Sequence, residues 1–217
     1  MRVYKKTLLS MMLATTILFG SACGNGTSNV NEGSTMKMES STVTESKEET
    51  IDYNSIIAQL EDTDSPSFAD FNGITMDGKV VDESIIKEKK LTMINVWATF
   101  CGYCIDEMPH LNELNQEYAD QGFQVIGAIT DVLNSNGTVI DSQMDLAKEI
   151  VAKTGVEYPT LLPTNDLIRM LLGGVSSVPA TIFVDSDGNL VGDGYLGAKS
   201  KADWEKIIQE KLKEVQS

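Results

Sequence analysis

Two cysteines, Cys101 and Cys104, stand between an apolar run typical of a strand and a run with helical spacing. Residues 91–97 are rich in strand formers, which indicates a buried strand, and the helical spacing after the pair extends to Tyr118. A cysteine at the start of a helix faces unpaired backbone N–H groups and the positive end of the helix dipole, and both stabilise a thiolate. Because the thiolate is the nucleophile, Cys101 is predicted to attack and Cys104 to resolve a mixed disulfide.

The C-x-x-C spacing alone also fits half of a zinc site or a purely structural disulfide. Zinc would need two more ligands, and the candidates of the usual kind are Cys23 and His110. Cys23 is far away in the sequence, and His110 is expected to be an exposed helical residue. We therefore expect a redox pair, with no metal ion and no cofactor.

The remaining pattern alternates strands with helices and ends in an antiparallel hairpin, which indicates an α/β fold with a central mixed β-sheet flanked by helices. Pro109 is expected to kink the helix after the cysteines or to bound its first turn. Ser200 and Asp203 form a capping box for a last helix. The other expected strands lie at 123–129 and 158–162, and the other expected helices at 142–154 and 165–172. Met144, Leu146 and Ile150 of the helix at 142–154 are expected in the core. An amphipathic piece is expected at 51–60, and hairpins are expected over 68–81 and between 180–184 and 190–195.

The N-terminus has the pattern of a secretory signal. Arg2, Lys5 and Lys6 precede an apolar stretch over 8–19, and small residues follow. A membrane-spanning helix needs about 20 apolar residues, so a removed signal peptide over residues 1–22 is expected instead. Residues 18–23 resemble a bacterial lipobox, which predicts that Cys23 is lipidated.

Residues 24–50 carry few large apolar side chains, and such a segment does not bury enough surface to fold. The expected organisation is therefore the lipidated Cys23 with a flexible acidic tether over 23–62, followed by a folded domain over 63–217. The formal net charge of −15, without a basic run beyond the N-terminus, excludes nucleic acid as an expected partner.

Three motifs together resemble the TlpA/ResA type of membrane-anchored extracytoplasmic thioredoxins. They are the run from Trp97 to Cys104, its continuation C-x-x-E-x-P from Cys104 to Pro109, and the loop and strand from Gly174 to Val184. The resemblance extends over residues 65–213. It implies a thioredoxin-like fold with an N-terminal β-hairpin and an added strand–helix insertion, and thiol–disulfide oxidoreductase activity.

The resemblance also implies roles for single residues. Pro179 would be a cis-proline facing the disulfide, and the backbone of Val178 would pair with an extended substrate. Glu107 would tune the proton equilibria of the cysteine pair. This expectation gains weight because Asn95 stands where cytoplasmic thioredoxins carry a buried Asp. Trp97 would be core packing beneath the site.

Three further residues around the cysteines are expected to contact substrate together with Val178: Phe100, Gly102 and Tyr103. Phe100 replaces the Trp usual before the first cysteine, which predicts a surface contact for partners. Tyr103 replaces the Pro common between the cysteines. Since this dipeptide influences the redox potential, the direction of electron flow stays open at this point.

The expected function is reduction of disulfides in exported proteins, for example in cytochrome c maturation or in support of methionine sulfoxide reductases. Electrons would come from an integral-membrane donor protein, and the chain would be a monomer lipid-anchored to the outer face of the cytoplasmic membrane. One alternative is a disulfide oxidase or isomerase, although residues 24–64 are too short and polar for the dimerisation domain of isomerases. Another is a copper-binding metallochaperone, although the C-x-x-x-C spacing and later His of such relatives are missing. A solute-binding lipoprotein is disfavoured by size and by the reactive pair.

Overall fold

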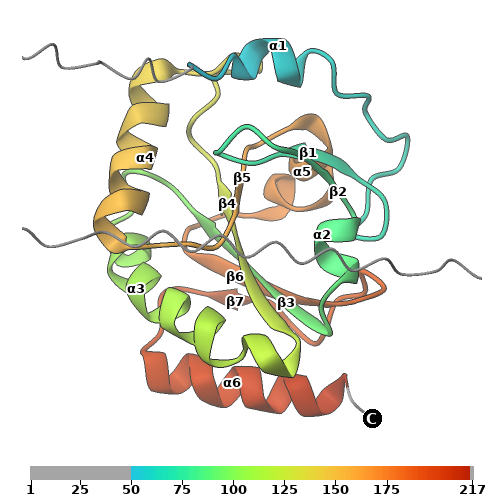
Figure 1. The fold of residues 1–217 in the computed structure, drawn as a ribbon, viewed down its shortest axis with the longest axis vertical. Coiled ribbons are helices and arrows are strands. Elements are labelled where there is room, and N and C mark those ends of the chain that lie inside the picture. Colours follow the sequence, from blue (N-terminus) through green and yellow to red (C-terminus); the bar gives the residue numbers. More distant parts are fainter. Residues whose placement is uncertain (1–49, 216–217) are drawn as a thin grey trace, which may run out of the picture. The chain divides into compact units, whose positions relative to one another are not determined.

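The computed structural model describes residues 50–215, which lie in one compact unit, Glu48–Ser217. The expected signal peptide, Cys23 and the tether up to residue 49 lie outside the described residues. The centre of the unit is a five-stranded sheet in the order β5-β4-β3-β6-β7 (Figure 1). Its strands are β3 (Leu91–Trp97), β4 (Phe123–Ile129), β5 (Thr160–Leu161), β6 (Ala180–Asp185) and β7 (Tyr195–Leu196). The first three run parallel, and β6 and β7 pair antiparallel, which confirms the mixed sheet.

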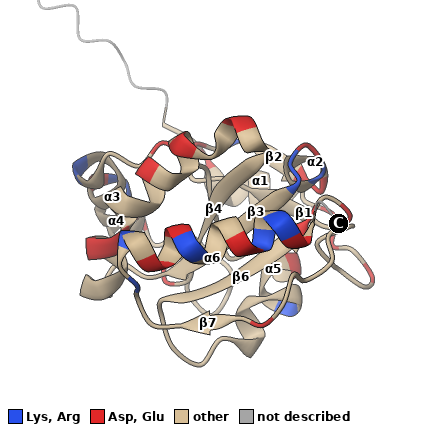
Figure 2. Ribbon diagram, turned by 90° about the horizontal axis from the view of Figure 1, so that it is seen from below, with Lys and Arg blue, Asp and Glu red and all other residues tan. Residues whose placement is uncertain are grey.

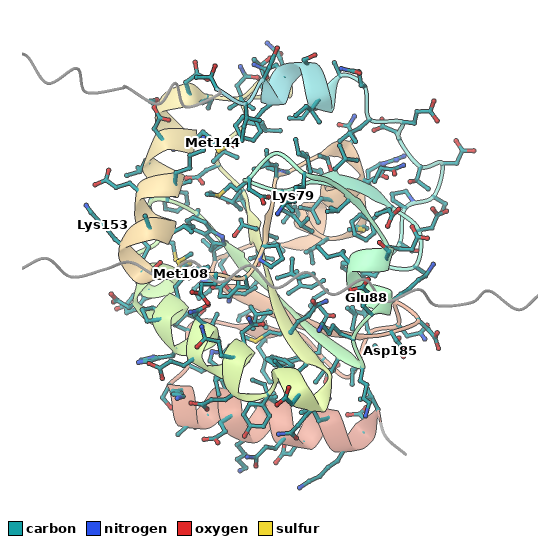
Figure 3. The ribbon with its side chains drawn as sticks, in the orientation of Figure 1. Lys79, Glu88, Met108, Met144, Lys153 and Asp185 are labelled. Atoms are coloured by element: carbon teal, nitrogen blue, oxygen red, sulfur yellow. A yellow bond between two sulfur atoms is a disulfide. The ribbon has the colours of Figure 1, made fainter. Side chains whose placement is uncertain are left out.

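Helices cover both faces of the sheet. Side chains alternate between the faces along a strand, so Met93 and Trp97 of β3 pack with α3, α4 and α6, while Ile94 and Val96 pack with α2 and α5. Figure 3 shows Met108 and Met144 on the inner sides of α3 and α4, with Lys153 pointing outward. The helices are α1 (Tyr53–Ile57), α2 (Ser84–Lys87), α3 (Gly102–Glu117), α4 (Asp141–Thr154), α5 (Asn165–Met170) and α6 (Lys201–Glu214), with short 3₁₀ turns η1 (Ala119–Gln121) and η2 (Leu172–Gly174).

The expected N-terminal hairpin is present as β1 (Asn72–Ile74) and β2 (Val80–Asp82). The amphipathic piece expected at 51–60 contains α1, whose Tyr53 is buried and donates a hydrogen bond to the Met76 carbonyl. The insertion expected before β6 is also present. It is formed by α4, which ends at Gly155 in the left-handed conformation, and by β5. The thioredoxin-like α/β fold is therefore confirmed.

The last helix, α6, is joined to α3 by apolar and charged contacts. Trp204 and Ile208 are buried in the same cluster as Leu111 of α3, and Lys201 lies 2.7 Å from carboxylates of Glu113 and Glu117. Ser200 caps α6 by accepting the Asp203 N–H. Lys and Asp or Glu residues intersperse along the outer side of this helix (Figure 2).

Two expectations are wrong in detail. The strand expected at 190–195 is reduced to a bridge at Leu190 and to β7, because Gly192 takes a positive φ of 73° that breaks the extended chain. Leu146 is 40% exposed instead of lying in the core, since α4 buries its Met144, Ala147 and Ile150 side. Of the two alternatives expected for Pro109, the structure rules out that it bounds the first turn, because Pro109 lies inside α3.

Candidate functional site

Cys101 and Cys104 lie where β3 ends and α3 begins, and they are joined by a disulfide with the Cα atoms 5.3 Å apart. Cys101 is the N-cap of α3, and its Sγ accepts the backbone N–H of Cys104 at 3.2 Å. A sulfur in this place is positioned so that the helix terminus stabilises its thiolate form. Cys101 is 8% exposed and Cys104 is fully buried. An incoming group would therefore meet Cys101 first.

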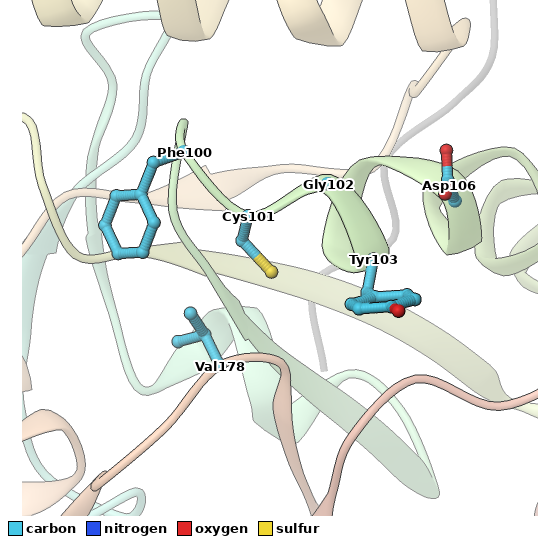
Figure 4. A pocket seen from close by; sticks show the side chains of 6 residues that line it. All are labelled: Phe100, Cys101, Gly102, Tyr103, Asp106 and Val178. Atoms are coloured by element: carbon cyan, nitrogen blue, oxygen red, sulfur yellow. The ribbon is translucent and has the colours of Figure 1, made fainter.

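A shallow hollow of about 460 Å³ opens beside Cys101. Phe100, Tyr103 and Val178 surround the Cys101 side chain, and Gly102 and Asp106 complete the lining (Figure 4). Phe100 and Tyr103 are 78% and 77% exposed, so two large apolar side chains flank the sulfur. Exposed aromatic side chains around a reactive group form a surface suited to binding another protein.

The loop from η2 to β6 forms the other side of the hollow. The Val178–Pro179 peptide bond is cis, the isomer that the resemblance implied. Among residues 50–215, the N–H and C=O of Val178 take no part in the hydrogen bonds of the protein itself. These groups are therefore free to pair with an extended peptide, as in strand addition.

Glu107 lies one turn after Cys104 on the buried side of α3 and is 2% exposed. Its Oε1 accepts the side-chain amide of Asn95 at 3.0 Å. Its Oε2 accepts the Trp204 indole N–H at 3.1 Å and the backbone N–H of Lys199 at 3.2 Å. Three donors thus compensate the burial of this carboxylate, which would be costly without partners.

The loop that leads into Cys101 is hydrogen-bonded to Asp131, which lies just after the end of β4. The Asp131 carboxylate accepts the Thr99 N–H at 3.0 Å and the Thr99 hydroxyl at 2.6 Å. Trp97 is fully buried in the core beneath this loop, as expected. His110 is exposed on α3. The hydrogen bonds of Asp131 and the packing of Trp97 fix the backbone that carries the disulfide.

Sequence reasoning did not assign Asp131, Trp204, Lys199 or Thr181 to the site. Asp131 directly follows a predicted strand, at the edge of the sheet where α3 begins. This position in the sequence could have indicated that Asp131 belongs to the site. Trp204 was assigned only to the apolar stripe of the last helix, and no local pattern indicates that its indole N–H reaches Glu107. Within residues 50–215, no group of three or more His, Cys, Asp or Glu side chains is arranged to hold a metal ion.

Comparison with known proteins agrees with this geometry. A family model described as Redoxin matches residues 61–208. The chain is 27% identical over 137 residues to the thiol-disulfide oxidoreductase ResA of Bacillus anthracis, an alignment that covers 62% of this chain and 70% of that protein. It is 32% identical over 132 residues to the thiol:disulfide interchange protein DsbE of Vibrio cholerae. This alignment covers 60% of this chain and 62% of that protein.

Solved structures show the same fold. A thiol:disulfide interchange protein of the thioredoxin family from Chlorobium tepidum superposes with a TM-score of 0.55 at 27% identity, covering 70% of this chain and 99% of that one. A DsbF homologue from Corynebacterium diphtheriae superposes with a TM-score of 0.53 at 24% identity. The superposition covers 67% of this chain and 85% of that one. The second of these supports the fold alone.

Proposed function

Because this chain belongs to the Redoxin family and is a thiol–disulfide oxidoreductase, we propose that it reduces disulfide bonds of exported proteins at the outer face of the cytoplasmic membrane. The single observation that carries the chemistry is the disulfide between a surface-accessible Cys101 at the N-terminus of α3 and a fully buried Cys104. The direction of electron flow, the location and the partners are the proposed parts.

The cycle begins with the reduced pair. The Cys101 thiolate attacks one sulfur of the substrate disulfide, forms a mixed disulfide and releases the other substrate sulfur as a thiolate that takes up a proton. Cys104 then loses its proton and attacks Cys101 Sγ, which expels the second substrate thiol. Two electrons have moved to the substrate, and the protein is left in the Cys101–Cys104 disulfide form of the structure. A thiol donor protein must return the two electrons.

Glu107 is proposed to tune the proton equilibria of Cys104 during the second step. The carboxylate lies one helical turn from Cys104 on the same side of α3, and both are buried. A negative charge beside a buried thiol opposes formation of a second negative charge, while a nearby carboxylate can also accept the departing proton. The three hydrogen bonds to Glu107 fix its place relative to the pair.

Substrate binding is proposed at the hollow of Phe100, Gly102, Tyr103 and Val178. The free N–H and C=O of Val178 would pair with an extended backbone, and the exposed rings of Phe100 and Tyr103 would cover the apolar side chains beside the substrate disulfide. Pro179 follows Val178 in this loop and is joined to it by the cis peptide bond. Such recognition uses backbone and apolar contacts, so it suits several client proteins.

Membrane attachment is proposed through a lipid on Cys23, after removal of a signal peptide over residues 1–22, with a tether between the lipid and the folded domain. This part rests on the sequence pattern of the N-terminus. In residues 50–215 no helix is long and apolar enough to span a bilayer. We further propose that an integral-membrane protein supplies the electrons and that the chain acts as a monomer on exported clients.

The reduction potential of the Glu48–Ser217 unit, equilibrated with glutathione and dithiothreitol buffers, tests the direction. A value near or below about −250 mV would support a reductase, on the thioredoxin side of the scale. A value near about −120 mV would place the protein among the oxidants and overturn the proposed direction. The matched control is the Cys101→Ser, Cys104→Ser variant, which should show no redox transition.

A further inference from the structure

A second hollow of about 350 Å³ adjoins the Cys101 hollow. Phe100 and Val178 line both hollows, so these two residues form the border between them. Figure 4 shows both on one side of Cys101, with Tyr103 on the other side. The second hollow also contains Ile168 of α5, whose side chain is 43% exposed. A polypeptide that leaves the Cys101 hollow past Phe100 therefore meets a further apolar surface.

The loop 176–178 runs along the second hollow with an unpaired backbone. Ser176, Ser177 and Val178 all line this hollow, and the two serines are exposed. Among residues 50–215, the backbone N–H and C=O groups of these three residues take no part in the hydrogen bonds of the protein itself. Consecutive free backbone groups can pair with an extended peptide. The pairing proposed at Val178 can therefore continue away from Cys101.

A larger groove of about 720 Å³ follows the second hollow and lies between α1, the loop 133–138 and the start of α5. Thr130, Pro163 and Ile168 line both the second hollow and this groove, so the two are adjacent. The Cys101 hollow, the second hollow and the groove thus form one series along the surface, which leads from the disulfide to α1.

Asparagine side chains give this groove its chemistry. Asn54 Oδ1 accepts the Val139 N–H at 2.9 Å, and Asn134 Oδ1 accepts the N–H groups of Asn136 at 2.9 Å and Thr138 at 3.1 Å. Because both oxygens are used in this way, the N–H₂ groups of the two amides point away from these partners. Among residues 50–215 neither N–H₂ group has an acceptor, and the exposed Asn136 side chain has no partner. We call this depression the amide groove.

The amide groove offers hydrogen-bond donors without a positive charge. Among the described residues that line it there is no Lys, Arg or His, and there is one acid, Asp62, which accepts the Asn165 side-chain amide at 3.0 Å. An anion would find no opposite charge here and would meet a carboxylate. A ligand with a row of neutral acceptors fits better, and the carbonyl groups of an extended polypeptide are such a row.

We propose that the second hollow and the amide groove bind the polypeptide that flanks a client disulfide. The client leaves the Cys101 hollow, pairs with the backbone of 176–178, covers Ile168 with an apolar side chain and presents its carbonyl groups to the amide groove. The inference rests on the proposed function of the Cys101 hollow and adds a substrate class. Disulfides in extended, unfolded segments can use the whole series, whereas disulfides inside compact domains reach the Cys101 hollow alone.

Three peptides test the proposal on the full chain, each with a single cysteine disulfide-bonded to glutathione. One peptide is short, and the other two are extended by about six residues, roughly 20 Å of chain, on the N-terminal or the C-terminal side of the cysteine. The measurement is the half-saturating peptide concentration in a single turnover by the pre-reduced protein. We expect one of the two extensions to lower it about tenfold, which corresponds to about 1.4 kcal/mol. We call this ratio the extension gain.

Two variants should abolish most of the extension gain. Asn136→Asp replaces a free donor by a charged acceptor that opposes the peptide carbonyls, and Ile168→Ala removes the exposed apolar contact. Gln121→Glu makes the same change of amide to carboxylate at an exposed residue of η1, before β4 begins. Leu146→Ala removes an apolar side chain that is 40% exposed on α4. Both controls should keep the extension gain.

The proposal is overturned if neither extension lowers the half-saturating concentration, or if the extension gain in Asn136→Asp equals that of the unchanged protein. A concentration-dependent dimer that Asn136→Asp abolishes would assign the amide groove to a second copy of the chain and would also overturn it. The short peptide separates the two claims, because failure to reduce it would reject the proposed reductase function. Binding of the extended peptides with Ser in place of Cys, measured by fluorescence anisotropy, would then still test the groove.

Discussion

The indole N–H of Trp204 on α6 donates to Glu107 Oε2 on α3 at 3.1 Å, across 97 residues of sequence. The amide of Asn95 and the backbone N–H of Lys199 reach the same carboxylate. The central strand, the active-site helix and the last helix therefore meet at one buried charge beside the cysteine pair. Glu107 therefore joins α3 to the central strand and to the last helix by hydrogen bonds, and in the proposed function it also tunes the cysteine pair.

Glu107→Gln should lower both stability and turnover. A glutamine offers one acceptor oxygen where the carboxylate serves three donors, and its N–H₂ group must face at least one of them. We expect a loss of about 1–3 kcal/mol in the free energy of unfolding and disulfide reduction slower by roughly 100-fold. Urea denaturation and a turnover assay measure the two effects.

Glu113→Gln on the outer side of α3 is the control for this variant. Glu113 is exposed and pairs with Lys201, so the change should stay within about 0.5 kcal/mol. Equal turnover of Glu107→Gln and the unchanged protein would show that the carboxylate is structural only.

Cys104→Ser should accumulate a mixed disulfide between Cys101 and a client. Cys101 is the cysteine at the surface, and without the buried Cys104 thiol nothing resolves its bond to the substrate. Non-reducing electrophoresis after incubation with a disulfide-containing protein should show a one-to-one adduct that dithiothreitol releases. Cys101→Ser should form no such adduct, and an adduct in that variant would reverse the assigned order of attack.

Phe100→Ala should weaken client binding without unfolding the protein. The ring is 78% exposed beside the Cys101 hollow, so its loss leaves the core intact, and we expect a stability change within about 0.5 kcal/mol. Removal of an aromatic contact at the centre of a binding surface typically costs about 1–2 kcal/mol, which is roughly a 5–30-fold rise in KM. Leu190→Ala, an apolar residue 62% exposed away from the hollow, should leave KM unchanged.

Much of the fold could be predicted because its central strands carry a strong local signal. Strands β3 and β4 have the predicted bounds, Leu91–Trp97 and Phe123–Ile129, since both are buried on both faces and read as continuous apolar runs. The second arm of the last hairpin could not be predicted in detail. Whether Gly192 continues a strand or takes a positive φ is decided by tertiary contacts.

The site likewise has residues that a local sequence motif indicates and residues that only tertiary contacts bring together. Cys101, Cys104, Val178 and Pro179 are carried by short motifs, so the approach of Val178 to the hollow beside Cys101 follows from the order of strands and helices. The donors to Glu107 come from positions 12 to 97 residues away from it in the sequence, and no local pattern around any of them points to the carboxylate. Only the packed structure shows that they are neighbours.

Asp166→Asn should destabilise the domain at neutral pH and lose this effect in acid. Asp166 is buried on α5, and its carboxylate accepts the N–H groups of Thr63 (3.1 Å) and Asn72 (2.9 Å) and pairs with Arg169 at 2.8 Å. Burial alone would raise the pKa of Asp166, but these hydrogen bonds together outweigh it and hold the pKa below its ordinary value.

A pKa that folding depresses contributes stability above the unfolded value, which is about 3.9 for Asp, and this stability is lost as the pH falls further through the folded value. The free energy of unfolding of Asp166→Asn should therefore lie about 1–3 kcal/mol below that of the unchanged protein at pH 7, and the difference should shrink below about pH 4. Urea denaturation at pH 7, 5 and 3 measures it, with the exposed Asp145→Asn as control. A difference that stays the same at pH 3 would mean that Asp166 acts through shape and not through its charge.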